Sequence, residues 1–398
     1  MMKPIIQGNV AKNCHPEGLL KAIDKQIAYV ESHGEIYGPK KVLVIGASSG
    51  YGLASRIALA FGGSADTIGV SFEKGPGEKG AGSAGWYNNV LFQRRASEKG
   101  LIAKDFIADA FSDTTRQNVI DFIQQEFGGK IDLVVYSVAS GIRLHPDGTR
   151  YHSTLGVRGQ AFSGPGFELE SQRMVEQTLE PVTEQQLADT VKVMGGEDWQ
   201  RWITMLEQAY VLAAGFKTVA YSYIGPESTW PLYKEGSLGA AKAHLHNTAD
   251  EINAQLQRIS GNAYAVICKA LVTKASAFIP VFPLYITLLY KVMKQKRLHE
   301  TCIEQMHRLM LDHLYPPLGK VTTDAQRLIR MDDYELRPDV QNAVELLRKQ
   351  VTADNFMVIG DFAGYLQEFH ELNGFGMAGV DYSDELDIHT LVKEYSLA

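Results

Sequence analysis

Cysteine is scarce in this sequence, and the three cysteines are placed where they cannot form a disulfide framework. Cys14, Cys268 and Cys302 are odd in number, far apart and in no C-x-x-C pair. This spacing argues against a disulfide-stapled secreted domain and a zinc knuckle, and it is typical of a reducing compartment such as the cytoplasm. The histidines lack acidic or cysteine partners at ligand spacing, so we also expect no metal site.

The chain also lacks an excess of positive charge and a long apolar run. Its 39 Lys and Arg against 46 Asp and Glu give a net charge of −7, which provides no broad cationic surface for nucleic acid. The most apolar stretch, residues 275–289, contains two prolines and is shorter than the roughly 20 residues that span a bilayer. The first residues, MMKPIIQGNVAKNCHPEG, lack the apolar stretch that a secretory signal needs. We therefore expect a cytoplasmic protein without a transmembrane segment.

What the sequence does contain is an alternation of short apolar runs with segments of helical periodicity. The runs predict strands at 41–45, 67–73, 101–111, 131–140, 217–225 and 263–273. Helices are expected at 19–31, 53–63, 115–127 and 248–259 and near residues 184 and 198. This alternation predicts an α/β fold, a Rossmann-like doubly wound parallel sheet. We expect 75–85 to be a glycine-rich loop, 141–181 an irregular insert, and 275–289 a buried or lid-like helix.

The first predicted strand runs directly into the segment GASSGYG (46–52), which fits two different turns. Its first five residues match G-x-S-x-G, the turn that carries the nucleophilic serine of α/β-hydrolases, and histidines follow at positions 244, 246 and 370. The same segment fits a glycine-rich turn that binds the pyrophosphate of a dinucleotide at a helix N-terminus.

Glu73 favours the dinucleotide interpretation. It ends the second strand of a strand–turn–helix–strand unit of about 30 residues, where an acidic side chain can accept hydrogen bonds from the adenosine ribose hydroxyls. The hydrolase interpretation does not account for this residue. A carboxylate there would repel a 2′-phosphate, so NADH is favoured over NADPH, although the neighbouring Lys74 would weaken that preference.

A tyrosine and a lysine supply the expected chemistry of a short-chain reductase. Tyr290 and Lys294 have the usual Tyr-x-x-x-Lys spacing, but they follow the apolar run and are better explained as a helix end. Tyr233 and Lys242 follow the fifth predicted strand and are separated by eight residues, which would put them on opposite faces of one helix. They can cooperate if Tyr233 lies on an irregular lead-in and Lys242 on the next helix, and a nearby cation would then lower the phenol pKa.

Long strings around these residues resemble one known family. The Tyr233-x8-Lys242 spacing, GASSGYGLASRIALAFG, GVSFEK, VVYSVAS, AYSYIGPESTWPLY and ALVTKASAFIPVFPLY are similar to the FabV-type trans-2-enoyl-CoA/acyl-carrier-protein reductases. The similarity runs from NCHPEG near residue 13 to GFGMAGVDY near residue 382. One departure is Gly141, where we expect the family's proline.

The resemblance implies an NADH-dependent, monomeric enoyl reductase of fatty acid biosynthesis that acts on thioesters of coenzyme A or acyl carrier protein. Hydride would go to the β-carbon, Tyr233 would stabilise the enolate oxygen, Lys242 would hold the cofactor and Tyr223 would contact the substrate. Segment 275–289 would cover the acyl chain. The implied NADH contacts are Gly46, Ala47, Ser48, Ser49, Gly50, Tyr51, Phe72, Glu73, Asp109, Ala110, Ser137, Val138, Lys242, Leu271, Val272 and Thr273.

Two further expectations concern flavin binding and the division of the chain into parts. Some descriptions of the family assign FAD binding to its C-terminal part, but no residue pattern here requires FAD. We expect residues 1–398 to form one enlarged Rossmann-type domain with helical insertions as a substrate lid. Within it, residues 41–140 would be the dinucleotide-binding half and 141–215 an insert. Residues 216–300 would hold the catalytic pair and the lid, and 301–398 would be a C-terminal helical extension. Another short-chain reductase activity, such as ketoacyl reduction, and a non-catalytic NADH-binding protein are the remaining alternatives.

Overall fold

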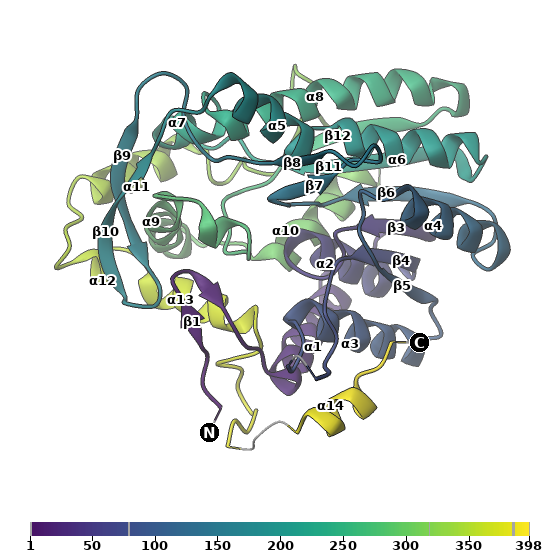
Figure 1. Cartoon of the computed structure of the whole chain (residues 1–398), viewed down its shortest axis with the longest axis horizontal. Coiled ribbons are helices and arrows are strands. Elements are labelled where there is room, and N and C mark those ends of the chain that lie inside the picture. The colour runs from purple at the N-terminus through teal and green to yellow at the C-terminus, as the bar shows by residue number, and fades with distance from the viewer. Residues whose placement is uncertain (1, 79, 318, 384–386, 398) are drawn as a thin grey trace.

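A parallel sheet forms the centre of the molecule because several apolar runs are buried on both faces. The computed structural model describes residues 2–78, 80–317, 319–383 and 387–397. Seven parallel strands lie in the order β13-β12-β11-β6-β3-β4-β5 (Figure 1). Their bounds are Lys41–Ile45 (β3), Asp66–Ser71 (β4), Ala103–Ile107 (β5), Ile131–Tyr136 (β6), Leu212–Ser222 (β11), Asn262–Ile267 (β12) and Ile329–Arg330 (β13). This order reverses between β3 and β6, as in doubly wound folds that bind a ligand at that switch point.

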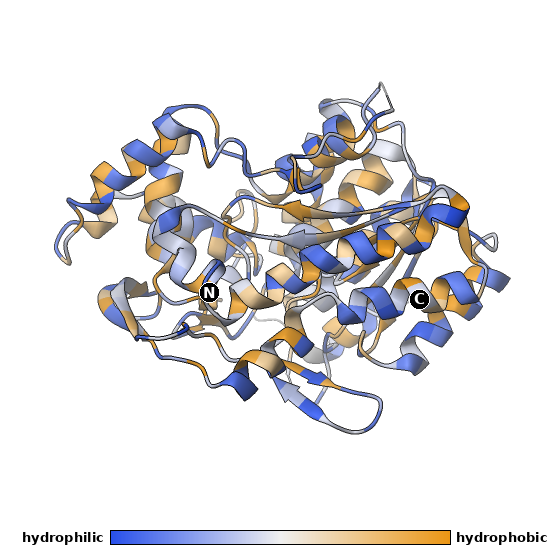
Figure 2. Ribbon diagram, turned by 90° about the horizontal axis from the view of Figure 1, so that it is seen from above, coloured by the Kyte–Doolittle hydropathy of each residue, from blue (hydrophilic) through white to orange (hydrophobic). Residues whose placement is uncertain are grey.

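Helices cover both faces of the sheet. Successive residues of β3 point to opposite faces, so Val42 and Val44 join one hydrophobic core while Leu43 and Ile45 join the other. The helices that pack on the first face are α1 (Pro16–Ser32), α2 (Gly50–Ile57), α3 (Ala84–Glu98) and α10 (Cys302–Arg308). Those on the second face are α4 (Asp113–Gln125), α6 (Glu197–Gln208) and α8 (Ser237–Gln255). In Figure 2 the helices of the molecule are banded polar and apolar, as expected where one side of a helix faces a core.

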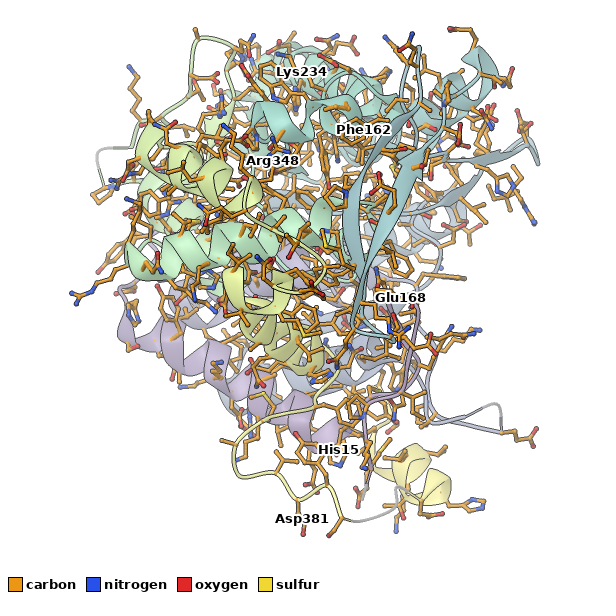
Figure 3. The ribbon with its side chains drawn as sticks, turned by 90° about the vertical axis from the view of Figure 1, so that its left-hand side faces the viewer. His15, Phe162, Glu168, Lys234, Arg348 and Asp381 are labelled. Atoms are coloured by element: carbon orange, nitrogen blue, oxygen red, sulfur yellow. The ribbon has the colours of Figure 1, made fainter. Side chains whose placement is uncertain are left out.

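A third core lies beside the sheet and forms the wall of the substrate region. It contains α7 (Trp230–Tyr233), α9 (Phe282–Gln295), α11 (Pro338–Arg348), α12 (Phe356–Ile359), α13 (Phe362–Glu371) and the hairpin of β9 (Phe162–Glu168) and β10 (Arg173–Leu179). Figure 3 shows this hairpin running along one side of the molecule, with Phe162 and Glu168 at opposite ends of β9. The remaining elements are β1 (Ile6–Gln7), β2 (Val10–Ala11), β7 (Ile142–Leu144), β8 (Arg150–His152), α5 (Glu184–Met194) and α14 (Ile388–Glu394).

The structure confirms the α/β class and the six predicted strands, and it corrects the insert. Residues 141–181 are not irregular, because they form the hairpins β7–β8 and β9–β10. Gly164, Pro165 and Gly166 weaken the strand signal of β9, but pairing with β10 overrides that low propensity. The glycine-rich loop contains position 79, which lies outside the described residues. No described helix combines the length and apolarity that crossing a membrane requires.

Candidate active site

The turn after β3 is crowded in a way that requires glycine. Gly46 has a φ of +87°, and a Cβ there would lie 2.1 Å from the carbonyl oxygen of Ser137. A Cβ at Gly52 would lie 1.9 Å from the carbonyl oxygen of Gly46. The turn therefore lies flat against β6, and α2 begins at Gly50 without a side-chain cap on its first N–H groups. Such free N–H groups can bind a pyrophosphate.

Glu73 lies just beyond β4 and holds two hydroxyls. Its Oε1 accepts a hydrogen bond of 2.6 Å from Ser48 Oγ, and its Oε2 accepts one of 2.5 Å from Ser83 Oγ. Ser48 thus donates to a carboxylate and has no histidine partner among the described residues. The downstream histidines are engaged elsewhere, with His246 Nε2 2.8 Å from Ser222 Oγ and His244 Nδ1 accepting from the N–H of Gly196. This arrangement contradicts the hydrolase interpretation.

Three other predicted NADH contacts, Phe72, Asp109 and Ala110, follow β4 and β5 at the same edge of the sheet. Phe72 is 81% exposed, so its ring is free to contact a ligand. Asp109 Oδ1 accepts from the N–H of Phe111, and the carbonyl of Ala110 accepts from Trp202 Nε1. The side chains of Asp109 and Trp202 therefore hold the loop after β5, and Phe72 remains exposed beside Glu73.

A cavity of about 200 Å³ lies where β3, β6, β11 and β12 end, and it unites the central predicted residues. Its predicted lining residues are Tyr51, Ser137, Val138, Tyr223, Tyr233, Lys242, Leu271 and Thr273. Val272 instead points into the third core and donates its N–H to Tyr290 Oη. Ile279 and Phe282 come from the predicted lid segment 275–289, whereas the sequence did not indicate several further lining residues, which are Leu155, Met194, Tyr221, Ser222, Cys268 and Lys269.

Among the tyrosines that line the cavity, Tyr233 is the one whose hydroxyl has no hydrogen bond to another described residue. It ends the short helix α7, and Lys242 follows in the second turn of α8, as the spacing predicts. The rings of Tyr223 and Phe282 surround it at centroid distances of 4.6 and 4.8 Å. Burial and then the Glu335 carboxylate raise the pKa of Tyr233, so the expectation that Lys242 lowers it is wrong for the unliganded site. Tyr233 therefore holds its proton and can donate it.

Unlike the hydroxyl of Tyr233, the hydroxyl of Tyr223 has a hydrogen-bond partner, because it donates to a buried carboxylate. Glu335 is fully buried and accepts hydrogen bonds from Tyr223 Oη at 2.7 Å, Tyr285 Oη at 2.6 Å and the N–H of Ala270 at 2.6 Å. Burial raises the pKa of Glu335, and these three donors oppose that rise. Glu335 lies over a hundred positions from Tyr223, so no local pattern in the sequence reveals it.

Lys242 brings an ammonium group to the cavity without a counterion. The described residues provide its Nζ with no hydrogen bond or ion pair, and burial lowers its pKa to about 8. His246 lies one turn further along α8, and burial, Lys242 and Arg330 lower its pKa to about 4. At pH 7 the histidine is therefore neutral, and Lys242 is the cation available to a ligand in this part of the cavity.

The segment after Thr273 forms the apolar lid side of the cavity. Ala275, Ile279 and Phe282 line it, and α9 continues the segment into the third core. Val281, at the N-cap of α9, has a φ of +58°, which is rare for a β-branched residue. Its N–H donates to Gln177 Oε1 at 2.6 Å, so the β9–β10 hairpin holds this strained position. No cluster of metal-ligating side chains is found in the described part of the chain.

Three family models match successive parts of the chain. Residues 1–78 match the NAD(P)H binding domain of trans-2-enoyl-CoA reductase, and residues 80–315 match the trans-2-enoyl-CoA reductase catalytic region. Residues 323–386 match a model described as the enoyl reductase FAD binding domain.

The residues of this last segment do not fit a flavin dinucleotide. The two-residue strand β13 is not followed by a glycine turn, and α11 starts seven residues later behind Arg337. Most of the segment's glycines face protein, although Gly379 faces open space. A Cβ at Gly360 would meet Thr287, and one at Gly374 would meet the carbonyl oxygen of His15. We therefore derive no chemistry through FAD, whereas Gly46, Glu73 and Lys242 do fit NADH.

The chain is similar along its whole length to characterised reductases. It is 52% identical over 396 residues to the enoyl-[acyl-carrier-protein] reductase [NADH] 2 of Photobacterium profundum, with 99% of each chain covered. It is 49% identical over 394 residues to the trans-2-enoyl-CoA reductase [NADH] of Clostridium beijerinckii, with 98% of each covered. The crystal structure of a Clostridium trans-2-enoyl-CoA reductase in complex with NADH superposes with a TM-score of 0.96 at 45% identity, with 99% of each chain covered. The chain therefore belongs to the FabV-type family of NADH-dependent trans-2-enoyl thioester reductases.

Proposed function

We propose that this protein reduces the trans-2 double bond of enoyl thioesters, carried by coenzyme A or acyl carrier protein, as a step of fatty acid biosynthesis. The observation that supports this assignment best is a cavity in which the hydroxyl of Tyr233 and the ammonium of Lys242 have no partner among the described residues. Bound NADH supplies the hydride that adds to the β-carbon. The relatives' names favour this reaction over ketoacyl reduction and over a non-catalytic NADH-binding role.

The two tyrosines have different roles because their hydroxyls are engaged differently. Tyr233 donates its hydrogen bond to the thioester oxygen, which becomes negatively charged as the enolate forms, and its raised pKa keeps the donated proton available. Tyr223 directs its proton to Glu335 and therefore contributes the ring surface that positions the substrate against Phe282. Apolar lid residues from 275 onward enclose the acyl chain and exclude water.

The predicted cofactor contacts follow the ends of β3, β4, β5, β6 and β12. Lys242 hydrogen-bonds the nicotinamide ribose, the GASSGYG turn receives the pyrophosphate, and Glu73 accepts from the adenosine ribose hydroxyls in exchange for its serine partners. Glu73 also disfavours a 2′-phosphate, which supports NADH over NADPH. We propose that the remaining NADH contacts predicted from the sequence also bind the cofactor.

The assay that tests this function follows NADH absorbance at 340 nm with crotonyl-CoA for the wild type and Tyr233→Phe. We expect the wild type to oxidise NADH and the variant to lose about 10²-fold or more in kcat, because an oxyanion donor is removed. Both proteins should bind NADH equally in a fluorescence titration. Oxidation of NADH with acetoacetyl-CoA but not with crotonyl-CoA would instead identify a ketoacyl reductase.

We also propose the domain organisation, the compartment and the oligomeric state of the protein. We treat the chain as one enlarged Rossmann-type domain, because β13 and Glu335 of the C-terminal part contact elements of the central sheet and cavity. The cytoplasm is the compartment that fits an enzyme with three free thiols and soluble acyl carriers. A monomer is the proposed state in solution.

A further inference from the structure

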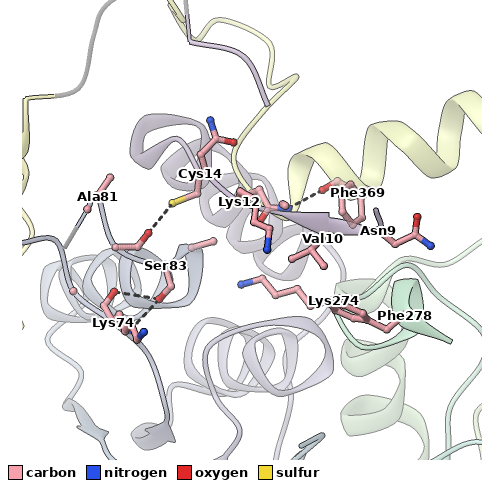
Figure 4. Close-up of a pocket in the computed structure, with 17 residues that line it drawn as sticks. Asn9, Val10, Lys12, Cys14, Lys74, Ala81, Ser83, Lys274, Phe278 and Phe369 are labelled. Carbon is pink, nitrogen blue, oxygen red and sulfur yellow. Dashed lines mark hydrogen bonds between the residues drawn. The ribbon is translucent and has the colours of Figure 1, made fainter. Parts of the chain in front are cut away.

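A second and larger cavity lies beside the segment that carries the lid. Its volume is about 490 Å³, and Figure 4 shows its walls. They come from residues 9–14 at the N-terminus, the loop after β4, the C-terminal end of α13 and the segment containing Lys274 and Phe278. None of these lining residues belongs to the contacts assigned to NADH above. The cavity thus requires an explanation of its own.

Three lysines give this cavity its chemical character. Lys12, Lys74 and Lys274 line it, and their Nζ atoms have no hydrogen bond or ion pair within the part of the chain that the structure describes. No Asp or Glu is among the described lining residues. Some other lysines of this acidic chain do have a carboxylate partner, as Lys41 has in Asp66 at 2.6 Å. Three unpaired ammonium groups around one cavity are suited to a ligand with several negative charges.

The cavity is adjacent to the catalytic one. Residues 273–279 form the partition between them, because Thr273, Ser276 and Ile279 line the catalytic cavity while Lys274 and Phe278 line the basic one. Ser276 holds this partition by donating to the carbonyl of Leu271 at 2.7 Å and accepting from the N–H of Thr273 at 2.8 Å. A ligand that reacts in the first cavity can therefore extend into the second around a short, fixed segment.

We propose that the basic cavity binds the phosphorylated end of the substrate's carrier, namely the diphosphate and 3′-phosphate of coenzyme A. This inference rests on the function proposed above. The volume is that of a site for a nucleotide-sized group, and the three lysines match its phosphates. Phe278, whose ring is 54% exposed at the cavity wall, offers a face on which the adenine stacks.

The 2′-phosphate of NADPH is a competing source of the same chemistry. Ser83 lines the basic cavity and donates to Glu73 Oε2, so a phosphate bound at the adenosine ribose would lie beside that carboxylate. Repulsion between the two anions disfavours this occupant. The phosphopantetheine arm of acyl carrier protein shares one phosphate with coenzyme A, and the choice of substrate separates these sources.

The test compares crotonyl-CoA, crotonyl-phosphopantetheine and the uncharged crotonyl-N-acetylcysteamine thioester with wild type, Lys12→Gln and Lys274→Gln. We expect each variant to raise KM for crotonyl-CoA about tenfold, because a charge-assisted phosphate contact is lost, with kcat within twofold. KM for the N-acetylcysteamine thioester should not change. A defect with crotonyl-CoA alone assigns the cavity to the adenosine phosphates, and an equal defect with crotonyl-phosphopantetheine would overturn that assignment. Lys349→Gln, which replaces the exposed lysine directly after α11, is the matched control.

Three further outcomes keep this inference separate from the proposed function. Unchanged KM values for both charged substrates in both variants, with an active wild type, would overturn the inference and leave the function intact. A raised Kd for NADH in the lysine variants, measured by fluorescence, would overturn the inference, because it would assign the lysines to the cofactor. A selective loss of NADPH binding would also overturn it, because it would assign the lysines to the 2′-phosphate. A wild type inactive on every crotonyl thioester would instead refute the proposed function itself.

Discussion

Glu335 shows how a residue outside every motif can determine the behaviour of one inside them. Its carboxylate accepts the hydrogen bond of the Tyr223 hydroxyl, whereas the hydroxyl of Tyr233 has no partner among the described residues. It also raises the pKa of Tyr233 through its charge. The sequence predicts both tyrosines, but it cannot predict the difference between them, because Glu335 reaches the site only through the tertiary fold.

Glu335→Gln therefore tests whether this carboxylate positions the substrate site. An amide presents a donor where the carboxylate accepts from two tyrosines and a backbone N–H, so one of these groups loses its partner. We expect kcat/KM for crotonyl-CoA to fall about tenfold or more, with the Kd for NADH within twofold. Glu368→Gln is the control, because Glu368 accepts from Tyr290 in the same core away from the cavity. A similar loss in both variants would indicate a purely structural role.

The pH dependence of NADH binding should report on Lys242. Its pKa in the unliganded protein is lowered by burial to about 8, so the ammonium is present below that pH and is lost above it. NADH that binds the ammonium raises the pKa, so binding above pH 8 must take up a proton. We expect the Kd for NADH to rise about tenfold between pH 7 and 9.5. Lys242→Met should bind more weakly at pH 7 and show no such rise, and an equal rise in the variant would refute the assignment.

The sequence predicts most accurately those helices, strands and turns whose pattern lies within their own residues. β3 and β6 are mostly apolar runs, and the turn after β3 carries its glycines at fixed spacing. The β9–β10 hairpin escaped prediction because its stability comes from cross-strand pairing and from contact with α9. β13 is two residues long and pairs with β12 at the sheet edge, so its formation depends on a partner already in place. The lid was predicted from its composition, whereas its anchoring through Gln177 was not.

Gly46→Ala tests the turn after β3 as an element. The φ of +87° disfavours an L side chain, and the new Cβ would collide with the carbonyl of Ser137, so the turn must move away from β6. We expect a lower midpoint of thermal unfolding and a loss of NADH binding of at least tenfold, measured by fluorescence. Gly141→Ala is the control, since its Cβ would have its nearest neighbour at 4.0 Å. Wild-type NADH affinity in Gly46→Ala would show that the turn does not form the pyrophosphate site.

At the scale of the whole molecule, the two ends of the chain are packed together. The N–H of His15 donates to the carbonyl of Asn373, and Gly18 lies so close to Gly374 that a Cβ would be 1.7 Å from its carbonyl oxygen. The segment matched by the FAD binding model also supplies β13 and Glu335 to the part that binds NADH. These contacts link that segment to the catalytic site as a structural support and do not form a separate flavin-binding unit.

Calorimetry with and without cofactors distinguishes these two roles. A supporting segment unfolds together with the sheet, so we expect a single transition that NADH at 100 times its Kd stabilises by about 2.7 kcal/mol, because it binds the folded state alone. FAD at the same concentration should leave the transition unchanged, and the purified protein should show no flavin absorbance near 450 nm. A separate transition that FAD raises selectively would contradict this view, because it would require a flavin site and a folding unit in residues 323–386 that the packing of Glu335 and Gly374 argues against.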